Sequence, residues 1–212
     1  MIQKELFLKR RYLSFKDLGL HTGIDLPIIN AGNITFYHYT RVDRLSLILN
    51  DGGGLRAWRR VACPSPPEEL INSFLIEGFL SPLPDWLIKS TYYSDLGYEL
   101  TKKYIGKLLL EVTIPISQYT IYVSEYSHIL ECKALEHGKG YGLAIGYDCS
   151  NGRESTQAYV NSYIPIQNYL RHHHAPIIQV INNEEGIIIP SNYIKICELQ
   201  PLKDLNEEGD FS

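Results

Sequence analysis

The chain lacks the features that mark secreted, membrane-spanning and zinc-binding proteins. It has four cysteines in 212 residues, and none lies close to another, so neither a zinc-ligand spacing nor a dense disulfide pattern is present. They are Cys63, Cys132, Cys149 and Cys197. The N-terminal segment MIQKELFLKRRYLSF is too charged for a signal peptide and contains no long apolar run. These absences predict a reducing, cytoplasmic location without membrane contact, and they leave open a toxin that is delivered by another route.

Strong charge of one sign is also absent. The formal net charge is −4 at pH 7, so the chain has no general basic field that would attract nucleic acid, although a local basic patch is compatible with this value. The hydrophobic fraction of 44% is that of an ordinary globular protein. Tyrosine, in contrast, is abundant at 16 residues. Its ring suits a site for flat ligands, and equally a β-rich core.

The segment Ile34–Leu55, ITFYHYTRVDRLSLILNDGGGL, has the clearest local organisation. Its first residues are β-branched and aromatic, which predicts a strand that ends near His38. Thr40 is placed to cap a helix whose apolar residues recur at helical spacing. Gly52–Gly54 can end that helix. His38 is therefore expected at the end of a strand, just before a helix, where many folds present polar groups to a ligand.

These residues also resemble the first motif of the ADP-ribosyltransferase superfamily, nearest to its DarT-like and tRNA 2′-phosphotransferase branches. The similarity rests on YHYT, the helix ending in IL, and the glycines and leucine that follow. In that superfamily the strand histidine hydrogen-bonds the nicotinamide-side ribose of NAD. The resemblance therefore implies that His38, with Tyr39 and Thr40, opens a pocket for NAD as substrate. A satisfied histidine in a plain β–α unit explains His38 equally well.

An arginine cluster follows in LRAWRRV, where Arg56, Arg59 and Arg60 flank Trp58. Guanidinium groups match phosphate oxygens, so this cluster could hold the NAD phosphates, with Arg56 as one candidate. A solvated surface cluster is the alternative.

A second block, Tyr92-Tyr93-Ser94-Asp95, resembles the "Tyr-Phe-Ala-Asp" pattern of the poly-ADP-ribose polymerase branch. There, a strand tyrosine stacks on nicotinamide and a small residue follows. The resemblance implies that Tyr92, or Tyr93 one residue later, takes this role beside Ser94. A flat leaving group needs a ring to hold it while the glycosidic bond stretches. Two strand tyrosines that point to opposite faces would give the same pattern.

A third block is where the resemblance weakens. Members of the superfamily usually carry a glutamate on a late strand, where it stabilises the positive charge that develops as nicotinamide leaves. Gln157–Tyr163 is predicted to be this strand. Set against the DarT-like pattern "Gln-Ala-Glu", the glutamate position falls on Tyr159, which cannot supply the charge. Glu154, just upstream, and Gln157 are therefore the candidates to face the reacting ribose, unless the chain belongs to a branch without the glutamate.

Hydrophobic periodicity predicts the remaining elements. Helices are expected over Gln3–Leu20, Pro66–Ile76 and Asp95–Tyr104. Glu111, inside an apolar strand, is most simply explained as facing outward, because a buried carboxylate needs a partner. The predicted strands are Gly106–Ile114, Tyr119–Ser124, Pro176–Ile181, Gly186–Ile189 and Ile194–Leu199.

Three consecutive histidines follow Arg171, and they do not predict a metal site. Neighbouring residues on a strand point to opposite faces, so at most His172 and His174 could share an ion, and nothing nearby completes the ligand set. A polar loop is predicted instead.

The sequence predicts one α+β domain over 33–203, preceded by an N-terminal helix and connector (1–32) and followed by an acidic tail (204–212) that is expected to be disordered. The resemblance implies a split β-sandwich of mostly antiparallel sheets with flanking helices. It also implies transfer of ADP-ribose from NAD to an unidentified protein, nucleic acid or small molecule, or hydrolysis of NAD. Two alternatives stay open: a non-catalytic nucleotide or NAD-metabolite binder on the same fold, and a protein-interaction module such as an immunity or regulatory protein.

Overall fold

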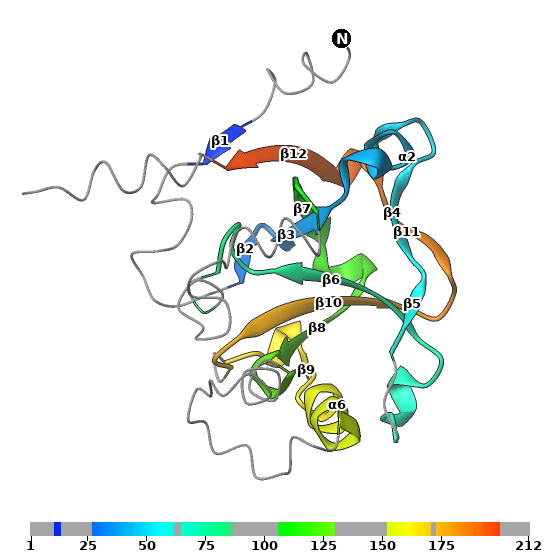
Figure 1. The fold of residues 1–212 in the computed structure, drawn as a ribbon, viewed down its shortest axis with the longest axis vertical. Helices are drawn as coiled ribbons and strands as arrows, with labels where there is room; N and C mark the ends of the chain where they lie inside the picture. Colours follow the sequence, from blue (N-terminus) through cyan, green and yellow to red (C-terminus); the bar gives the residue numbers. More distant parts are fainter. Residues whose placement is uncertain are drawn as a thin grey trace, which may run out of the picture.

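A ten-stranded, mostly antiparallel sheet is the centre of the computed structural model, which describes residues 11–13, 27–61, 65–84, 86, 106–129, 152–170 and 173–199. Its strand order is β1-β12-β7-β3-β6-β10-β8-β9, with β2 added to β3 and β5 added to β6 (Figure 1). The strands are β1 (Arg11–Leu13), β2 (Ile28–Asn30), β3 (Asn33–Thr40), β5 (Arg59–Arg60), β6 (Phe74–Phe79), β7 (Leu108–Pro115), β8 (Thr120–Glu125), β9 (Ile164–Pro165), β10 (Pro176–Asn182) and β12 (Ile194–Leu199). The pairings are antiparallel except for that of β1 with β12.

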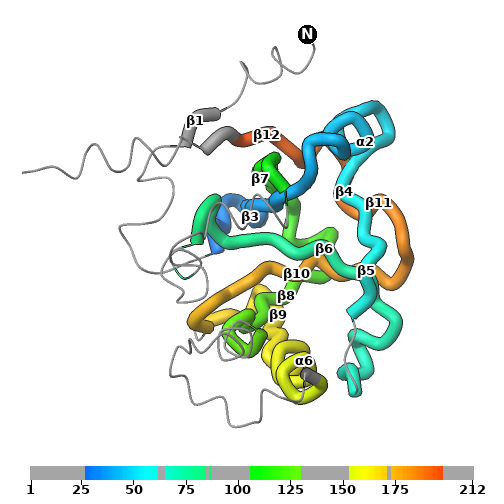
Figure 2. The backbone as a smooth tube through the Cα atoms, in the orientation of Figure 1, coloured from blue at the N-terminus to red at the C-terminus, as the bar shows by residue number. Residues whose placement is uncertain are grey.

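The remaining elements lie around this sheet. Figure 2 follows the chain from β3 through α2 into β4 and β5 along one side of the molecule, and then back into the sheet at β6. α6 lies beside β8 and β9. These elements are α2 (Leu45–Leu49), α6 (Gly152–Asn161), a two-stranded sheet of β4 (Gly54–Ala57) and β11 (Gly186–Pro190), and the 3-10 turns η1 (Val42–Arg44), η2 (Glu68–Leu70), η3 (Ile116–Gln118), η4 (Ile166–Asn168) and η5 (Ser191–Tyr193). The architecture confirms the α+β class with a mostly antiparallel sheet.

The large sheet almost divides between β3 and β6. β3 pairs with β7 along its whole length, whereas it meets β6 at the single pair Tyr37↔Phe79. We call this place the β3–β6 junction. Across it, the ring of Phe36 packs on the backbone of Gly78, because a Cβ added at Gly78 would lie only 2.3 Å from Phe36 Cδ2. The missing side chain at Gly78 therefore allows this close contact between the two halves of the sheet.

Successive side chains of β3 point to opposite faces of the sheet and belong to two separate apolar clusters. Ile34 and Phe36 belong to the main core, together with the inward residues of β7, β10, β4 and α2. Tyr37 and Tyr39 face the other side, where they pack with Phe79. Both faces of β3 are thus covered, which explains why the neighbouring residues Phe36 and Tyr37 are both buried.

Several predicted strands are confirmed. The structure has Ile194–Leu199 with the predicted bounds, and the strands expected at 34–39, 106–114, 119–124, 176–181 and 186–189 correspond to β3, β7, β8, β10 and β11. Glu111, however, does not face outward. It is buried in β7, and its Oε1 lies 3.9 Å from Nζ of Lys195 on the neighbouring strand.

Two predicted elements have the wrong secondary structure. Gln157–Tyr163 is not a late strand, because Gly152–Asn161 forms α6, in which Ser155 and Tyr159 are buried at the i, i+4 spacing of a helix face. Pro66–Ile76 is not a helix. Its acidic residues begin only the short η2 turn, and its buried end belongs to β6, whose two faces are both covered.

The predicted element starts are also partly wrong. Within the expected helix Gln3–Leu20, the described residues Arg11–Leu13 form β1. Thr40 is the last residue of β3 and not a helix cap; η1 follows Arg41, which makes no capping bond with its side chain. The expected helix Asp95–Tyr104 and the acidic tail lie outside the described residues. No helix among the described residues is long and apolar enough to cross a bilayer.

Candidate functional site

His38 lies near the end of β3, where this strand separates from β6. Its Nδ1 is 2.7 Å from the backbone oxygen of Glu77 in β6. A carbonyl oxygen can only accept, so Nδ1 carries the proton, and Nε2 of the neutral ring is left as a hydrogen-bond acceptor. The predicted strand-end position of His38 is confirmed, and its ring joins the two strands at the β3–β6 junction.

The environment of His38 favours its neutral form. Burial lowers the pKa of the imidazole from its ordinary value of 6.5, and this effect outweighs the hydrogen bond to the Glu77 backbone and the Glu77 charge, which both raise it. At neutral pH the ring is therefore uncharged, with a fixed donor on Nδ1 and a fixed acceptor on Nε2.

This shift predicts that His38 makes stability depend on pH. As the pH falls through 6.5, the unfolded chain binds a proton at His38 before the folded chain does, so the free energy of unfolding decreases until the lower, folded pKa is passed. We expect the native protein to lose stability relative to His38→Asn as the pH is lowered from about 7.5 to 5. Urea titrations at both pH values measure it, and a constant or increasing difference would contradict the shift.

Glu77, whose backbone oxygen contacts His38, has its carboxylate held by two side chains. Its Oε2 is 3.1 Å from Nη1 of Arg59, and its Oε1 accepts the hydroxyl proton of Tyr159 at 3.2 Å. Tyr159 comes from α6, so the helix reaches over the sheet to this carboxylate. Sequence reasoning missed Glu77 because it ended a predicted helix at Ile76 and expected no strand there. The available signal was a lone carboxylate in the apolar run FLIEGFL, which now forms β6.

Gln179 extends this contact into the core. It lies directly opposite Glu77 on β10, it is fully buried, and its Nε2 donates to the Tyr159 hydroxyl at 2.7 Å and to Ser124 Oγ at 3.1 Å. Burial, followed by the charge of Glu77, raises the pKa of Tyr159 well above its ordinary value. Tyr159 therefore stays a phenol that accepts from Gln179 and donates to Glu77. These contacts fix the direction of the Glu77 carboxylate.

The residues predicted for the site are distributed over several elements. Tyr39 is buried, and its hydroxyl donates to the backbone oxygen of Pro82 at 2.6 Å. Thr40 follows it at the end of β3. Arg56 lies on β4, where its Nη2 is 3.7 Å from Oε1 of Glu185, away from His38 in the small sheet. The predicted stacking residues Tyr92, Tyr93 and Ser94 lie outside the described residues.

The two predicted charge-stabilising residues lie on α6. Glu154 is exposed in its first turn. The side-chain amide of Gln157 does not bind the Glu77 carboxylate. It accepts from the backbone N–H of Ser65 at 2.9 Å and donates to the Ser65 carbonyl at 2.8 Å. The residue of α6 that contacts the Glu77 carboxylate is instead Tyr159, at the position where the expected glutamate was absent.

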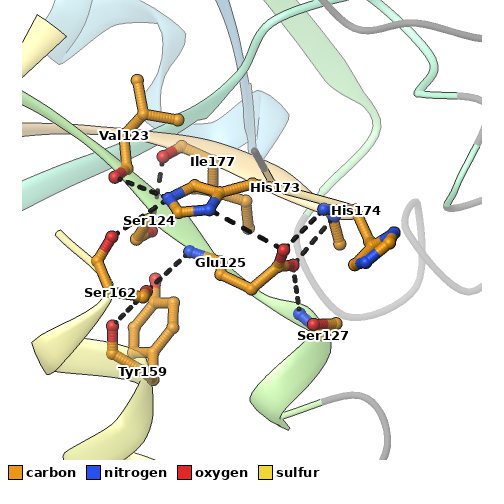
Figure 3. A network of polar contacts seen from close by, with 10 residues as sticks. Val123, Ser124, Glu125, Ser127, Tyr159, Ser162, His173, His174 and Ile177 are labelled. Carbon is orange, nitrogen blue, oxygen red and sulfur yellow. Dashed lines mark hydrogen bonds and ion pairs between the residues drawn. The ribbon is translucent and has the colours of Figure 1, made fainter. Parts of the chain in front are cut away.

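A second polar network, the Glu125 cluster, is built from the end of β8 and the start of β10 (Figure 3). The buried Glu125 carboxylate accepts backbone N–H groups from Ser127 at 3.1 Å and Ala175 at 2.9 Å, and also from His174. His173 lies against it, with Nδ1 3.8 Å from Glu125 Oε2. His173 lies in a loop before β10, as predicted, but its side chain is buried and connects strands.

The ring of His173 also ties the loop after α6 to the sheet. Its Nε2 lies 3.0 Å from the Ser162 carbonyl and 3.3 Å from the Val123 carbonyl, so this nitrogen carries a proton and donates. Ser162 Oγ accepts the Glu125 backbone N–H at 2.8 Å. Across residues 27–61, 65–84, 106–129, 152–170 and 173–199, no group of histidine, cysteine and carboxylate side chains is arranged to hold a metal ion.

Comparisons of the chain with family models, with curated proteins and with solved structures give no match.

Proposed function

We propose that this protein binds NAD at the β3–β6 junction and transfers its ADP-ribose to an acceptor or to water. The observation that carries the proposal is the contact of His38 with Glu77 at this junction, where a neutral imidazole with a fixed acceptor is bonded to the backbone of a residue whose carboxylate charge also acts on the ring. The near-division of the sheet at the same place also supports it, because the resemblance implies a split sandwich.

The chemistry needs two contacts that these residues can supply. His38 Nε2 would accept a hydrogen bond from a ribose hydroxyl and orient the sugar. As the C–N bond to nicotinamide breaks, its electron pair leaves with nicotinamide, and positive charge develops on the ribose. The Glu77 carboxylate would stabilise that charge, and the acceptor would then add its lone pair to the same carbon and release its proton.

A non-catalytic NAD-metabolite binder is the second candidate, and one observation favours it. Arg59 lies 3.1 Å from the Glu77 carboxylate and partly offsets its negative charge. An offset charge would still bind hydroxyl groups but would stabilise an oxocarbenium-like transition state less. Turnover therefore separates the two candidates.

The test is a thermal-shift titration with NAD, followed by an assay of nicotinamide release on the same sample. We expect NAD to raise the melting temperature and nicotinamide to be released, and we expect Glu77→Gln to lower the release about 10²–10³-fold while binding persists. The variant keeps an oxygen for Tyr159 and loses only an exposed ion pair, worth about 0–1 kcal/mol, so it should fold.

Glu184→Gln is the matched control, because Glu184 is an exposed glutamate in the turn between β10 and β11. It should leave binding and release unchanged. Stabilisation by NAD with no release in any acceptor condition would favour the non-catalytic binder. The absence of a shift at millimolar NAD would contradict both candidates.

A further inference from the structure

A pocket of about 170 Å³ lies between α6 and the β5–β6 edge of the sheet, and it shares Arg59, Glu77 and Tyr159 with the candidate site. Three of its walls are the rings of Tyr126, Tyr159 and Tyr163. Neighbouring rings in this set stand nearly perpendicular, with centroids 5.8 Å and 5.6 Å apart. Leu75 and Val160 add aliphatic surface. Ring edges and faces together with aliphatic groups favour a flat apolar ligand over an extended polar one.

The size of the pocket limits that ligand to one ring. An apolar cavity of about 150 Å³ accommodates benzene, so the volume here suits a six-membered ring with one small substituent. A mononucleotide or dinucleotide is too large to be enclosed. The pocket therefore calls for a different molecule from the NAD of the proposed function.

The charge of the pocket defines the substituent. Arg59 and Glu77 both line the pocket and pair with each other. Arg60 also lines it, and its guanidinium stacks over the ring of Phe74 at 5.1 Å, but no carboxylate in the described part of the chain pairs with it. Within the described residues, one positive charge is thus left without a counter-charge at the edge of an aromatic pocket. A carboxylate matches the planar guanidinium in both charge and geometry.

We propose that this pocket is a binding site for a small aromatic carboxylate with a single six-membered ring. The ring lies among the tyrosines, and the carboxylate binds Arg60. The paired Arg59 and Glu77 add no net charge, so the site selects a monoanion. The proposal goes beyond the proposed function, and it can be tested in the absence of NAD.

The experiment is a thermal-shift titration of the full-length protein with benzoate. Benzamide is the neutral probe of the same size, and acetate is the carboxylate without a ring. We expect benzoate, at about ten times its dissociation constant, to raise the melting temperature by about 3–6 °C. Benzamide and acetate at the same concentration should raise it by much less. No shift with millimolar benzoate, or an equal shift with benzamide, would overturn the proposal.

Three variants test which residues bind benzoate. Arg60→Met should abolish the benzoate shift, whereas Arg56→Met, which removes an exposed arginine outside the pocket, should keep it. Tyr163→Leu removes one wall without changing charge and should weaken the shift several-fold in apparent affinity. Each variant's melting temperature without ligand shows that it is folded. A benzoate shift that persists in Arg60→Met would place the ligand elsewhere and refute the assignment.

Discussion

Replacement of His38 by alanine is expected to lower nicotinamide release from NAD about 10²–10³-fold, if the proposed reaction takes place at the β3–β6 junction. The variant loses the acceptor on Nε2 that would orient the ribose. It also leaves the Glu77 backbone oxygen without the imidazole donor, which costs about 1–3 kcal/mol. Folded domains are stable by about 5–15 kcal/mol, so the variant should remain folded. Initial rates at saturating NAD, with the melting temperature of the same sample, measure both effects.

The matched control is His174→Ala. Its side chain is exposed, and its contact with Glu125 is made by the backbone N–H, which alanine keeps. This variant should retain the native rate. A His38→Ala variant with full activity would show that the imidazole does not take part, and it would refute the site assignment even if NAD were turned over.

Replacement of Glu125 by alanine is expected to have the largest effect on stability. Three backbone N–H groups would lose the carboxylate that accepts from them, and the buried His173 would lose its charged neighbour. Unsatisfied buried donors cost about 1–3 kcal/mol each, and shared relaxation reduces the sum, so we expect a loss of about 3–5 kcal/mol. For a chain of this size the melting temperature should fall by about 6–20 °C.

Two further variants serve as controls for the stability loss of Glu125→Ala. Glu125→Gln keeps one acceptor oxygen and should lose less stability than Glu125→Ala. Glu184→Ala, at an exposed turn, should change the unfolding free energy by no more than about 0.5 kcal/mol. If Glu125→Ala had the same melting temperature as the native protein, the Glu125 carboxylate would not be what holds the start of β10 to the end of β8.

Local patterns were enough to predict most of the sheet. The continuous apolar run that predicted 106–114 is a direct consequence of a strand covered on both faces. The same rule explains the error at Pro66–Ile76. Acidic residues before an apolar stretch favoured a helix, yet the burial of consecutive residues in β6 required a strand there.

The contacts of the candidate site could not be predicted in this way. His38 was identified from its place at a strand end, but its partner Glu77 lies in a strand that was not predicted. Glu77, Tyr159 and Gln179 come together through the register of β6 against β10 and through the packing of α6. Both depend on residues far apart in the chain, and no local periodicity encodes them. Because the sequence predicted a strand over Gln157–Tyr163, where the structure has α6, the contact of Tyr159 with Glu77 and Gln179 could not be foreseen.

The parallel pairing of β1 with β12 has a consequence for the synthesis of the protein. Arg11 lies opposite Cys197, so β1 leaves the ribosome long before its partner exists. At about 5–20 residues per second, the wait lasts roughly 10–40 s. During that time the N-terminal segment has no strand to join, and the central strands can pair before it. This edge of the sheet is therefore the last to be completed, and until then the nascent chain offers an unpaired strand to chaperones or to neighbouring chains.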